Sequence, residues 1–341
     1  MSTTSTTNTG SQSATPQAWV DLILGTADAS EIWADIFARL RDLALDNPGA
    51  AAIHRETIIP DRFLAETAWD LWQEFPRCAP SVISDLKKFW VSAPGVGTAV
   101  LVLDALSLRE LPLIVTAGKE RGLDPVCIEV RASEVPTETD RFAEALGLPS
   151  RSKLYNNNAP DSFVFTGPDV HTELLESPFA DCVATIPTTP RLFIWHKWPD
   201  EPLIHLHEDQ KDGPAVVAVQ TKKELSGDGF WALVNRLRQG RRLVITGDHG
   251  YADASNFSNE EKNEDTVKLL RSFFGAGRSA KDDPAKPWPR QHLPPLVCRH
   301  NGWLAVMGQR KWSVQGGFPN LCHRGLSLLE AAVPFLEFAP K

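Results

Sequence analysis

The stretch Thr98-Ala-Val-Leu-Val-Leu-Asp104 indicates the fold class of this 341-residue chain. It is a short, continuous apolar run that ends in an acid, a pattern typical of a parallel strand buried on both faces. The segment Arg242-Leu-Val-Ile-Thr-Gly247 repeats this pattern and leads directly into Asp248, His249 and Gly250. Ligands of open parallel sheets bind outside the carboxyl ends of the strands. Both polar ends are therefore predicted to lie at one functional edge.

Helical and strand-like segments alternate around these two runs. Helices are expected over 108–122, 140–146 and 229–239, and strands over 125–130, 162–165, 191–195 and 215–219. This alternation predicts an α/β fold, with a mostly parallel sheet covered by helices on both faces. Gly95-Val-Gly97 precedes a strand rather than following one, which disfavours a dinucleotide-binding fold.

Other parts of the chain have a different character. Residues 1–17 are nearly all small and polar, and we expect a disordered tail because they have no apolar surface to bury. Residues 18–92 show apolar positions at helical spacing and predict a small helical region, in which Pro60 opens one helix. The main domain is expected over 93–341, with an insertion at about 251–300 that includes a long loop rich in proline and lysine.

Composition limits the possible partners and the compartment. The chain has 35 Lys and Arg against 43 Asp and Glu, a net charge of −8, which disfavours non-specific nucleic-acid binding. No stretch approaches the about 18 consecutive apolar residues of a membrane helix, and no secretion signal is evident, so no membrane association is expected. Five scattered cysteines form no C-x-x-C pair. We therefore expect neither a disulfide framework nor a thiolate zinc site, and a cytoplasmic location.

Three polar clusters suggest a metal site. Asp104, Asp248-His249 and the late His323 each follow an apolar run, and carboxylates together with imidazoles suit zinc or manganese better than magnesium. Each also has a structural reading: Asp104 as a helix cap, Asp248-His249-Gly250 as a turn, and His323 as a buried core histidine.

A hydroxyl nucleophile is available in Pro136-Thr-Glu-Thr139, just before a predicted helix. A divalent cation lowers the pKa of such a hydroxyl, and a helix N-terminus favours an incoming phosphate. Thr137 and Thr139 are equally explained as helix N-caps, and a cap and a nucleophile can coincide.

Two sets of motifs resemble known proteins. Val102-Leu-Asp104, Thr246-Gly-Asp-His-Gly250 and His323 resemble the metal framework of the alkaline phosphatase superfamily. Within it, Pro136-Thr-Glu-Thr-Asp-Arg-Phe-Ala143 and His323-Arg-Gly-Leu-Ser-Leu-Leu-Glu-Ala-Ala-Val-Pro334 resemble the PglZ-domain family. That family often shows His-Gly-Gly-Leu-Ser-Leu-Glu-Glu followed by Val-Pro. The resemblance covers about 95–338 and implies an alkaline-phosphatase-like fold with up to two divalent ions, zinc or else manganese.

The resemblance also assigns site residues. It implies one metal ion surrounded by Asp104, Thr139, Asp248 and His249. Thr139 is then the nucleophile and Thr137 the alternative. Separately from the resemblance, we expect Arg141 to stabilise charge on the phosphate.

The second ion would be held by His323 and by an Asp-x-x-x-His pair, for which the candidates are Asp200, Glu201 and His205. Asp200 and His205 are five residues apart, one too many, whereas Glu201 and His205 have the right spacing but enclose Pro202, which disfavours a helical turn. Arg324 stands where the family often has glycine.

The implied function is a metal-dependent phosphohydrolase, either a phosphodiesterase or a phosphatase, acting on a phosphorylated small molecule or a nucleotide. A place beside bacterial phage-defence or signalling systems, with protein partners from them, is also implied. The alternative is a degenerate, non-catalytic scaffold that binds a protein partner or a nucleotide, suggested by the irregular second motif and the 251–300 insertion. A phosphoglycerate-mutase-like transferase ranks last, because it usually employs serine and needs a larger inserted domain.

Overall fold

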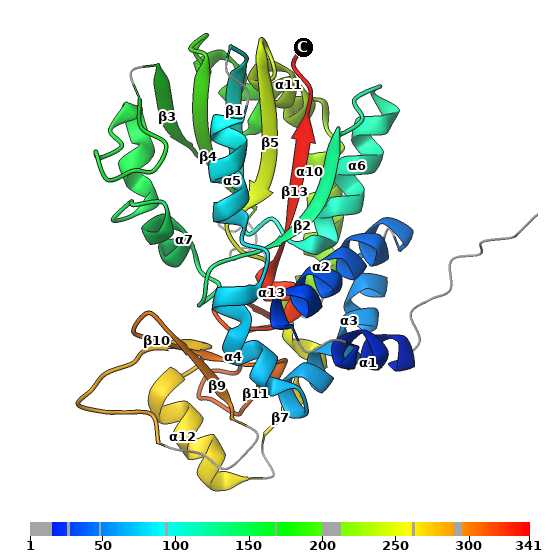
Figure 1. The fold of residues 1–341 in the computed structure, drawn as a ribbon, viewed down its shortest axis with the longest axis vertical. Coiled ribbons are helices and arrows are strands. Elements are labelled where there is room, and N and C mark those ends of the chain that lie inside the picture. The colour runs from blue at the N-terminus through cyan, green and yellow to red at the C-terminus, as the bar shows by residue number, and fades with distance from the viewer. Residues whose placement is uncertain are drawn as a thin grey trace, which may run out of the picture.

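The computed structural model describes residues 16–25, 28–47, 49–92, 95–167, 169–199, 213–260, 263–289 and 295–341. Its centre is a six-stranded sheet of order β2-β13-β5-β1-β4-β3. The strands are β1 (Gly97–Asp104), β2 (Cys127–Ala132), β3 (Val170–Leu175), β4 (Arg191–Pro199), β5 (Arg241–Gly247) and β13 (Ala332–Phe338). The pairings β5-β1, β1-β4 and β4-β3 are parallel, whereas β13 runs antiparallel to β5 and β2 (Figure 1). The prediction of an α/β fold with a mostly parallel sheet is confirmed.

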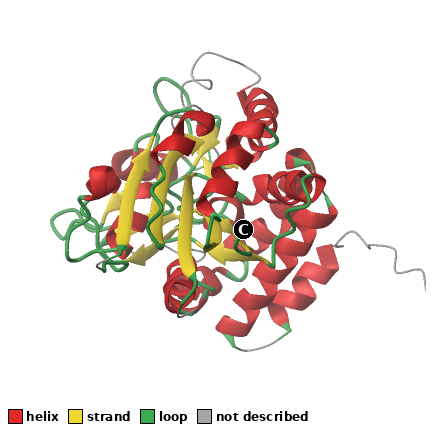
Figure 2. Cartoon of the chain, turned by 90° about the horizontal axis from the view of Figure 1, so that it is seen from above, coloured by secondary structure: helices red, strands yellow, loops and turns green. Residues whose placement is uncertain are grey.

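Helices cover both faces of this sheet (Figure 2). One layer contains α2 (Ala29–Asp46), α6 (Leu111–Glu120), α8 (Phe179–Cys182), α10 (Gly213–Leu225) and α11 (Asp228–Leu237), and the other contains α5 (Val82–Val91) and α7 (Thr139–Ala145). Successive residues of β1 point to opposite faces of the sheet. Leu101 and Leu103 pack in the first core, under the layer that contains α2, and Val100 and Val102 pack in the second core, under the layer that contains α5. Because both faces of β1 are buried, its sequence is continuously apolar.

The segment before β1 is helical. It contains α1 (Pro16–Leu24), α2, α3 (Ala50–Glu66), α4 (Trp69–Cys78) and α5. Trp33 packs against Trp72 and Phe75 with ring centroids 4.8 Å apart in both pairs, so the aromatic stripes form core. Pro60 lies inside α3, so the prediction that it opens a helix is wrong; the buried proline ring packs in the interior and the helix continues past it. Residues 1–15 of the expected tail lie outside the described residues.

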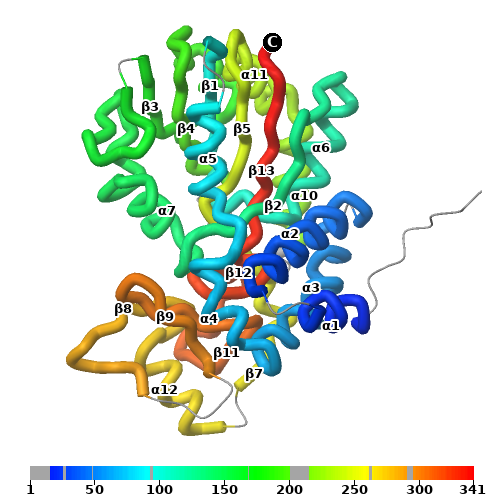
Figure 3. The backbone as a smooth tube through the Cα atoms, viewed as in Figure 1, coloured from blue at the N-terminus to red at the C-terminus, as the bar shows by residue number. Residues whose placement is uncertain are grey.

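Below the carboxyl ends of the parallel strands lies a smaller part of the chain, yellow to orange in Figure 1. It contains α12 (Glu264–Phe274) and a three-stranded antiparallel sheet of β8 (Ser279–Lys281), β10 (Trp303–Val306) and β9 (Val297–His300). Short pairs link β7 (Ser258–Asn259) with β11 (Arg310–Lys311) and β6 (Ala252–Asp253) with β12 (Leu321–Cys322). The stretch from β12 to β13, which includes α13 (Leu328–Ala331), runs between this part and the large sheet (Figure 3). The domain boundaries set out above stay a prediction.

Two expected strands are wrong. Residues 215–219 belong to α10, where Val217, Thr221 and Leu225 are buried at helical spacing; a short apolar run does not by itself distinguish a strand from a buried helix. Residues 162–165 form turns whose Phe163 and Phe165 fill the second core. None of the described helices has the length and apolar character of a membrane span.

Candidate metal centre

Three buried side chains converge at the ends of two neighbouring strands. Asp104 is the last residue of β1, and Asp248 and His249 directly follow β5. The parallel register places Leu103 beside Gly247, so the residues that follow must meet. The ligand atoms of Asp104, Asp248 and His249 all lie within 4.8 Å of one another, and the three residues are fully buried.

Hydrogen bonds orient two of these side chains. Asp248 Oδ1 accepts from the backbone N–H groups of Ala105 at 2.8 Å and His249 at 3.0 Å, while its Oδ2 is buried without a hydrogen-bond partner. His249 Nδ1 lies 2.9 Å from the carbonyl oxygen of Gly250, which can only accept, so Nδ1 carries the proton. The lone pair of Nε2 is then free for a metal ion. Nε2 lies 3.8 Å from Asp104 Oδ1 and 3.7 Å from Asp248 Oδ2.

The two threonines have different surroundings. Thr139, the first residue of α7, places its Oγ1 3.3 Å from Asp104 Oδ1 and 3.3 Å from His249 Nε2, and it is partly exposed. Thr137 is fully buried, and its hydroxyl donates to the carbonyl oxygen of Gly325 at 2.9 Å. Of these two threonines, it is Thr139 that presents its hydroxyl to the triad side chains.

His323 lies beside the triad. Its ring stacks on that of His249, with centroids 4.4 Å apart and an interplanar angle of 7°. Its Nδ1 is 3.3 Å from the carbonyl oxygen of Thr137. Burial, followed by the nearby His249 and Arg324, holds the pKa of His323 well below its usual value. The ring is therefore neutral, the form in which imidazole ligates metals.

The motif after His323 has a structural explanation. Glu330 Oε1 accepts from Gly325 N at 3.0 Å, and Oε2 accepts from Ser327 Oγ at 2.6 Å. The same carboxylate forms a two-pronged ion pair with Arg278, whose Nε and Nη2 donate at 3.0 and 2.9 Å. A Cβ on Gly325 would come within 2.3 Å of Arg278 Nε, so only glycine fits there. The Gly-x-Ser-x-x-Glu part of the motif thus shapes the loop that carries His323.

Two arginines differ from expectation. The Arg141 guanidinium pairs with Glu144 and lies 4.2 Å from the ring centre of Trp303, and no contact joins it to the triad. Arg151, in a short 3₁₀ segment over Arg151–Asn157, instead pairs its Nη1 with Asp104 Oδ2. Sequence reasoning missed Arg151 and Arg278 because neither stands in a recognisable motif.

The candidates for the second ion cannot be placed. Asp200, Glu201 and His205 lie outside the described residues. Their convergence on His323 stays a prediction.

The triad fits one divalent ion. A tetrahedral zinc ion with bonds of about 2.0–2.2 Å holds its ligand atoms about 3.3–3.6 Å apart. The distances of 3.7 and 3.8 Å from His249 Nε2 come close to that spacing. The unpartnered Oδ2 of Asp248 is a buried anionic atom that requires a partner, and nitrogen and carboxylate oxygen together suit zinc or manganese.

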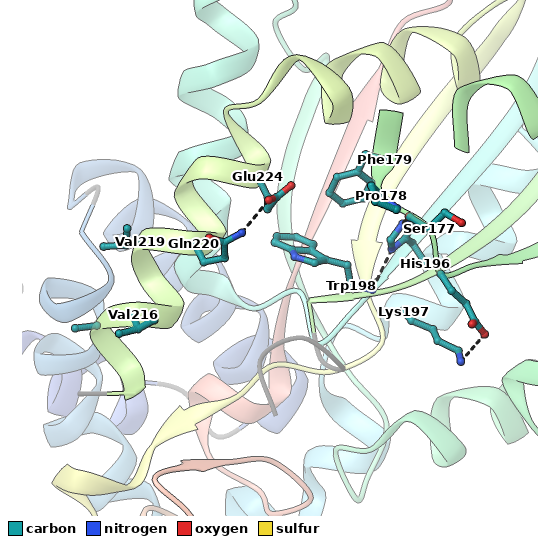
Figure 4. Close-up of a pocket in the computed structure, with 12 residues that line it drawn as sticks. Ser177, Pro178, Phe179, His196, Lys197, Trp198, Val216, Val219, Gln220 and Glu224 are labelled. Carbon is teal, nitrogen blue, oxygen red and sulfur yellow. Dashed lines mark hydrogen bonds and ion pairs between the residues drawn. The ribbon is translucent and has the colours of Figure 1, made fainter. Parts of the chain in front are cut away.

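Two cavities border this edge of the sheet. One of about 560 Å³ is lined by Arg278, Phe318, His323 and Arg324, and so extends to the ring that stacks on His249. The other, of about 800 Å³, lies between α10 and the ends of β3 and β4 (Figure 4).

The polar walls of the larger cavity are already paired. Lys197 pairs with Glu176 at 2.5 Å, and Gln220 donates to Glu224 at 2.9 Å. His196 Nε2 lies 3.0 Å from the Ser177 carbonyl oxygen, and burial lowers its pKa to about 4. This cavity therefore presents mainly apolar surface.

No protein-family model matches the chain, and neither does any curated protein. Among solved structures it is similar to murine ectonucleotide pyrophosphatase/phosphodiesterase 5 in complex with AMP, at 13% identity and a TM-score of 0.40, over 72% of this chain and 88% of that one. It is also similar to phosphonoacetate hydrolase from Sinorhizobium meliloti in complex with phosphonoformate, at 13% identity and a TM-score of 0.41, over 72% and 90%. Human ectonucleotide pyrophosphatase/phosphodiesterase 5 gives 12% identity and a TM-score of 0.41, over 72% and 88%.

Proposed function

We propose that the protein is a metal-dependent phosphohydrolase in which Thr139 is the nucleophile. One observation carries this proposal: a hydroxyl lies 3.3 Å from two members of a fully buried carboxylate–imidazole triad. The motifs around Thr139 and His323 further support assignment to the PglZ-domain family. The substrate is then a phosphorylated small molecule or a nucleotide.

In this proposal, each residue of the site has a separate role in the reaction. Asp104, Asp248 and His249 would hold a divalent cation, whose positive charge would favour the ionised form of the Thr139 hydroxyl. Thr139 Oγ1 forms a bond to phosphorus while the bond between phosphorus and the leaving-group oxygen breaks. Water then cleaves the phosphothreonine ester, which restores the hydroxyl. Arg151, already paired with Asp104, is placed to neutralise charge on a phosphoryl oxygen, the role that the sequence assigned to Arg141.

The remaining assignments rest on the sequence motifs. We propose that His323 and a partner among Asp200, Glu201 and His205 hold a second ion, with zinc the first choice of metal and manganese the second. We also propose a cytoplasmic location and an association with phage-defence or signalling proteins.

A non-catalytic scaffold that binds a protein partner or a nucleotide is the second candidate. The ion pair between Arg151 and Asp104 favours it, because a guanidinium then compensates a buried carboxylate without a metal ion.

The test combines metal analysis with turnover. Purified protein is assayed with zinc or manganese on bis(4-nitrophenyl) phosphate and on 4-nitrophenyl phosphate, and bound metal is measured by mass spectrometry. We expect at least one equivalent of metal, and turnover that falls by about two orders of magnitude or more in Thr139→Val. Asp248→Asn is expected to lose both metal and turnover.

Thr137→Val is the matched control, because it removes the same hydroxyl two residues away. Turnover lost in Thr137→Val but kept in Thr139→Val would reverse the nucleophile assignment. A folded protein with neither metal nor turnover would leave the scaffold as the function.

A further inference from the structure

A third cavity, separate from the metal centre, lies between the start of α3, the 3₁₀ turn η1 (Leu108–Glu110) and α10. Its volume is about 280 Å³, and its walls include Gly49, Ala50, Arg109, Thr221, Lys222 and Tyr251. None of the triad side chains lines it.

Arg109 is the unusual member of this wall. Only 6% of the residue is exposed, and its Nε and Nη2 are buried without a hydrogen-bond partner. Its guanidinium carbon lies over the ring of Tyr251, 3.8 Å from the ring centre. A cation–π contact engages the charge of the guanidinium, and the N–H groups on Nε and Nη2 still have no acceptor. A buried guanidinium with unused donors requires an acceptor.

Among the described residues that line this cavity, Glu110 is the one carboxylate, and its hydrogen bonds are already made. The Glu110 carboxylate already accepts from Tyr251 Oη at 2.8 Å, from Ser107 N at 2.9 Å and from Ser107 Oγ at 2.5 Å. Burial, and then the charge of Arg109, lowers the pKa of His54, which favours the neutral form of its ring.

Other donors face the same space. Thr221 Oγ1 is buried without a partner, and the ammonium group of Lys222 adds a positive charge from the next residue of α10. The 17-residue helix α3 begins at this wall, and its N-cap Gly49 provides no side-chain cap. Uncapped N–H groups at a helix N-terminus attract anions.

We propose that this cavity binds a small oxyanion, namely a phosphate group that is free or terminal on a larger ligand, with Arg109 as its main anchor. The site is independent of the proposed hydrolysis. Arg109 follows Asp104 by five residues and Tyr251 follows His249 by two, so the bound anion would contact the segments that continue from the metal ligands.

Calorimetric titration with inorganic phosphate in excess EDTA tests the proposal, because the chelator removes the metal-dependent site. We expect wild-type protein to bind with a Kd at or below about 1 mM. Arg109→Met should weaken binding by about tenfold or more, and Lys222→Gln by several-fold, since each removes a charged donor. Lys223→Gln, which removes an exposed charge at the next position of α10, is the matched control and should leave the Kd unchanged.

A second measurement keeps the test decisive if Arg109→Met fails to fold. Crystals of wild-type protein soaked in tungstate should show an anomalous signal between Arg109 and Lys222. No phosphate binding in EDTA, equal affinity in folded Arg109→Met, or tungstate found only elsewhere would each overturn the proposal.

Discussion

Replacing Arg278 by methionine should destabilise the protein strongly, because it breaks a fully buried ion pair. Arg278 and Glu330 have side chains that are 1% and 0% exposed, and two hydrogen bonds of 3.0 and 2.9 Å join them. The same guanidinium also donates to the carbonyl oxygens of Gly308 and Arg310, each at 2.6 Å. The substitution therefore leaves one carboxylate and two carbonyl groups buried without their donor.

The expected loss is about 3–5 kcal/mol of unfolding free energy, the usual result of removing one partner of a buried pair. That is a large part of the about 5–15 kcal/mol that stabilises a typical domain. Glu330 also anchors Gly325 and Ser327, so the loop that carries His323 should loosen with it.

Urea unfolding followed by tryptophan fluorescence measures this effect. Arg299→Met is the matched control: Arg299 is half exposed and lies 3.6 Å from Asp282, so its loss should cost at most about 1 kcal/mol. The double variant Arg278→Met/Glu330→Leu should recover part of the stability, because neither charge then remains, whereas the carbonyl groups of Gly308 and Arg310 still lack their donor. A loss below about 1 kcal/mol in Arg278→Met, or no recovery in the double variant, would refute the reasoning.

Four other substitutions have defined outcomes. Arg324 has a φ of 78°, which is costly for any residue with a Cβ, so Arg324→Gly should raise the unfolding free energy by about 1 kcal/mol; an unchanged urea midpoint would contradict this. Burial raises the pKa of Asp61 from 3.8 to about 8, so the folded state holds an extra proton between these values, and stability falls as pH rises through that window. Asp61→Asn should remove this pH dependence from thermal melts, and equal slopes in both proteins would argue against it. Thr137→Val should cost about 1–3 kcal/mol because it leaves the Gly325 carbonyl unsatisfied, whereas Thr139→Val should change stability by less than about 0.5 kcal/mol; equal urea midpoints would contradict the distinction.

Much of the fold could be predicted because a buried strand or helix has a recognisable pattern of apolar residues in its own short segment of sequence. A strand buried on both faces must be apolar throughout, and 98–104 and 242–247 show this directly as β1 and β5. The same rule failed at 215–219, since α10 also carries a short apolar run. The strand β13 includes Pro334, a residue type that argues against a central strand. In the structure, the Thr246 hydroxyl donates to the Pro334 carbonyl oxygen at 2.6 Å, next to the backbone pairing of Thr246 with Phe335.

The approach of Asp104 to Asp248 and His249 could be inferred from sequence, because two adjacent parallel strands end at the same edge. The choice between Thr137 and Thr139 could not, since both precede one helix and differ only in what each hydroxyl faces across the fold.

By itself, the sequence determined the class of sheet, the sheet edge at which chemistry is possible and the residue types gathered there. These features can be read from short segments, because the hydrophobic pattern of a strand and the polar residues at its end span only a few residues. Only the tertiary structure decided that Arg151 pairs with Asp104, that Arg278 forms an ion pair with Glu330 and that Arg109 lies over the Tyr251 ring. Each of these contacts joins segments whose separation along the chain carries no periodic signal, and their geometry is set by how the layers pack.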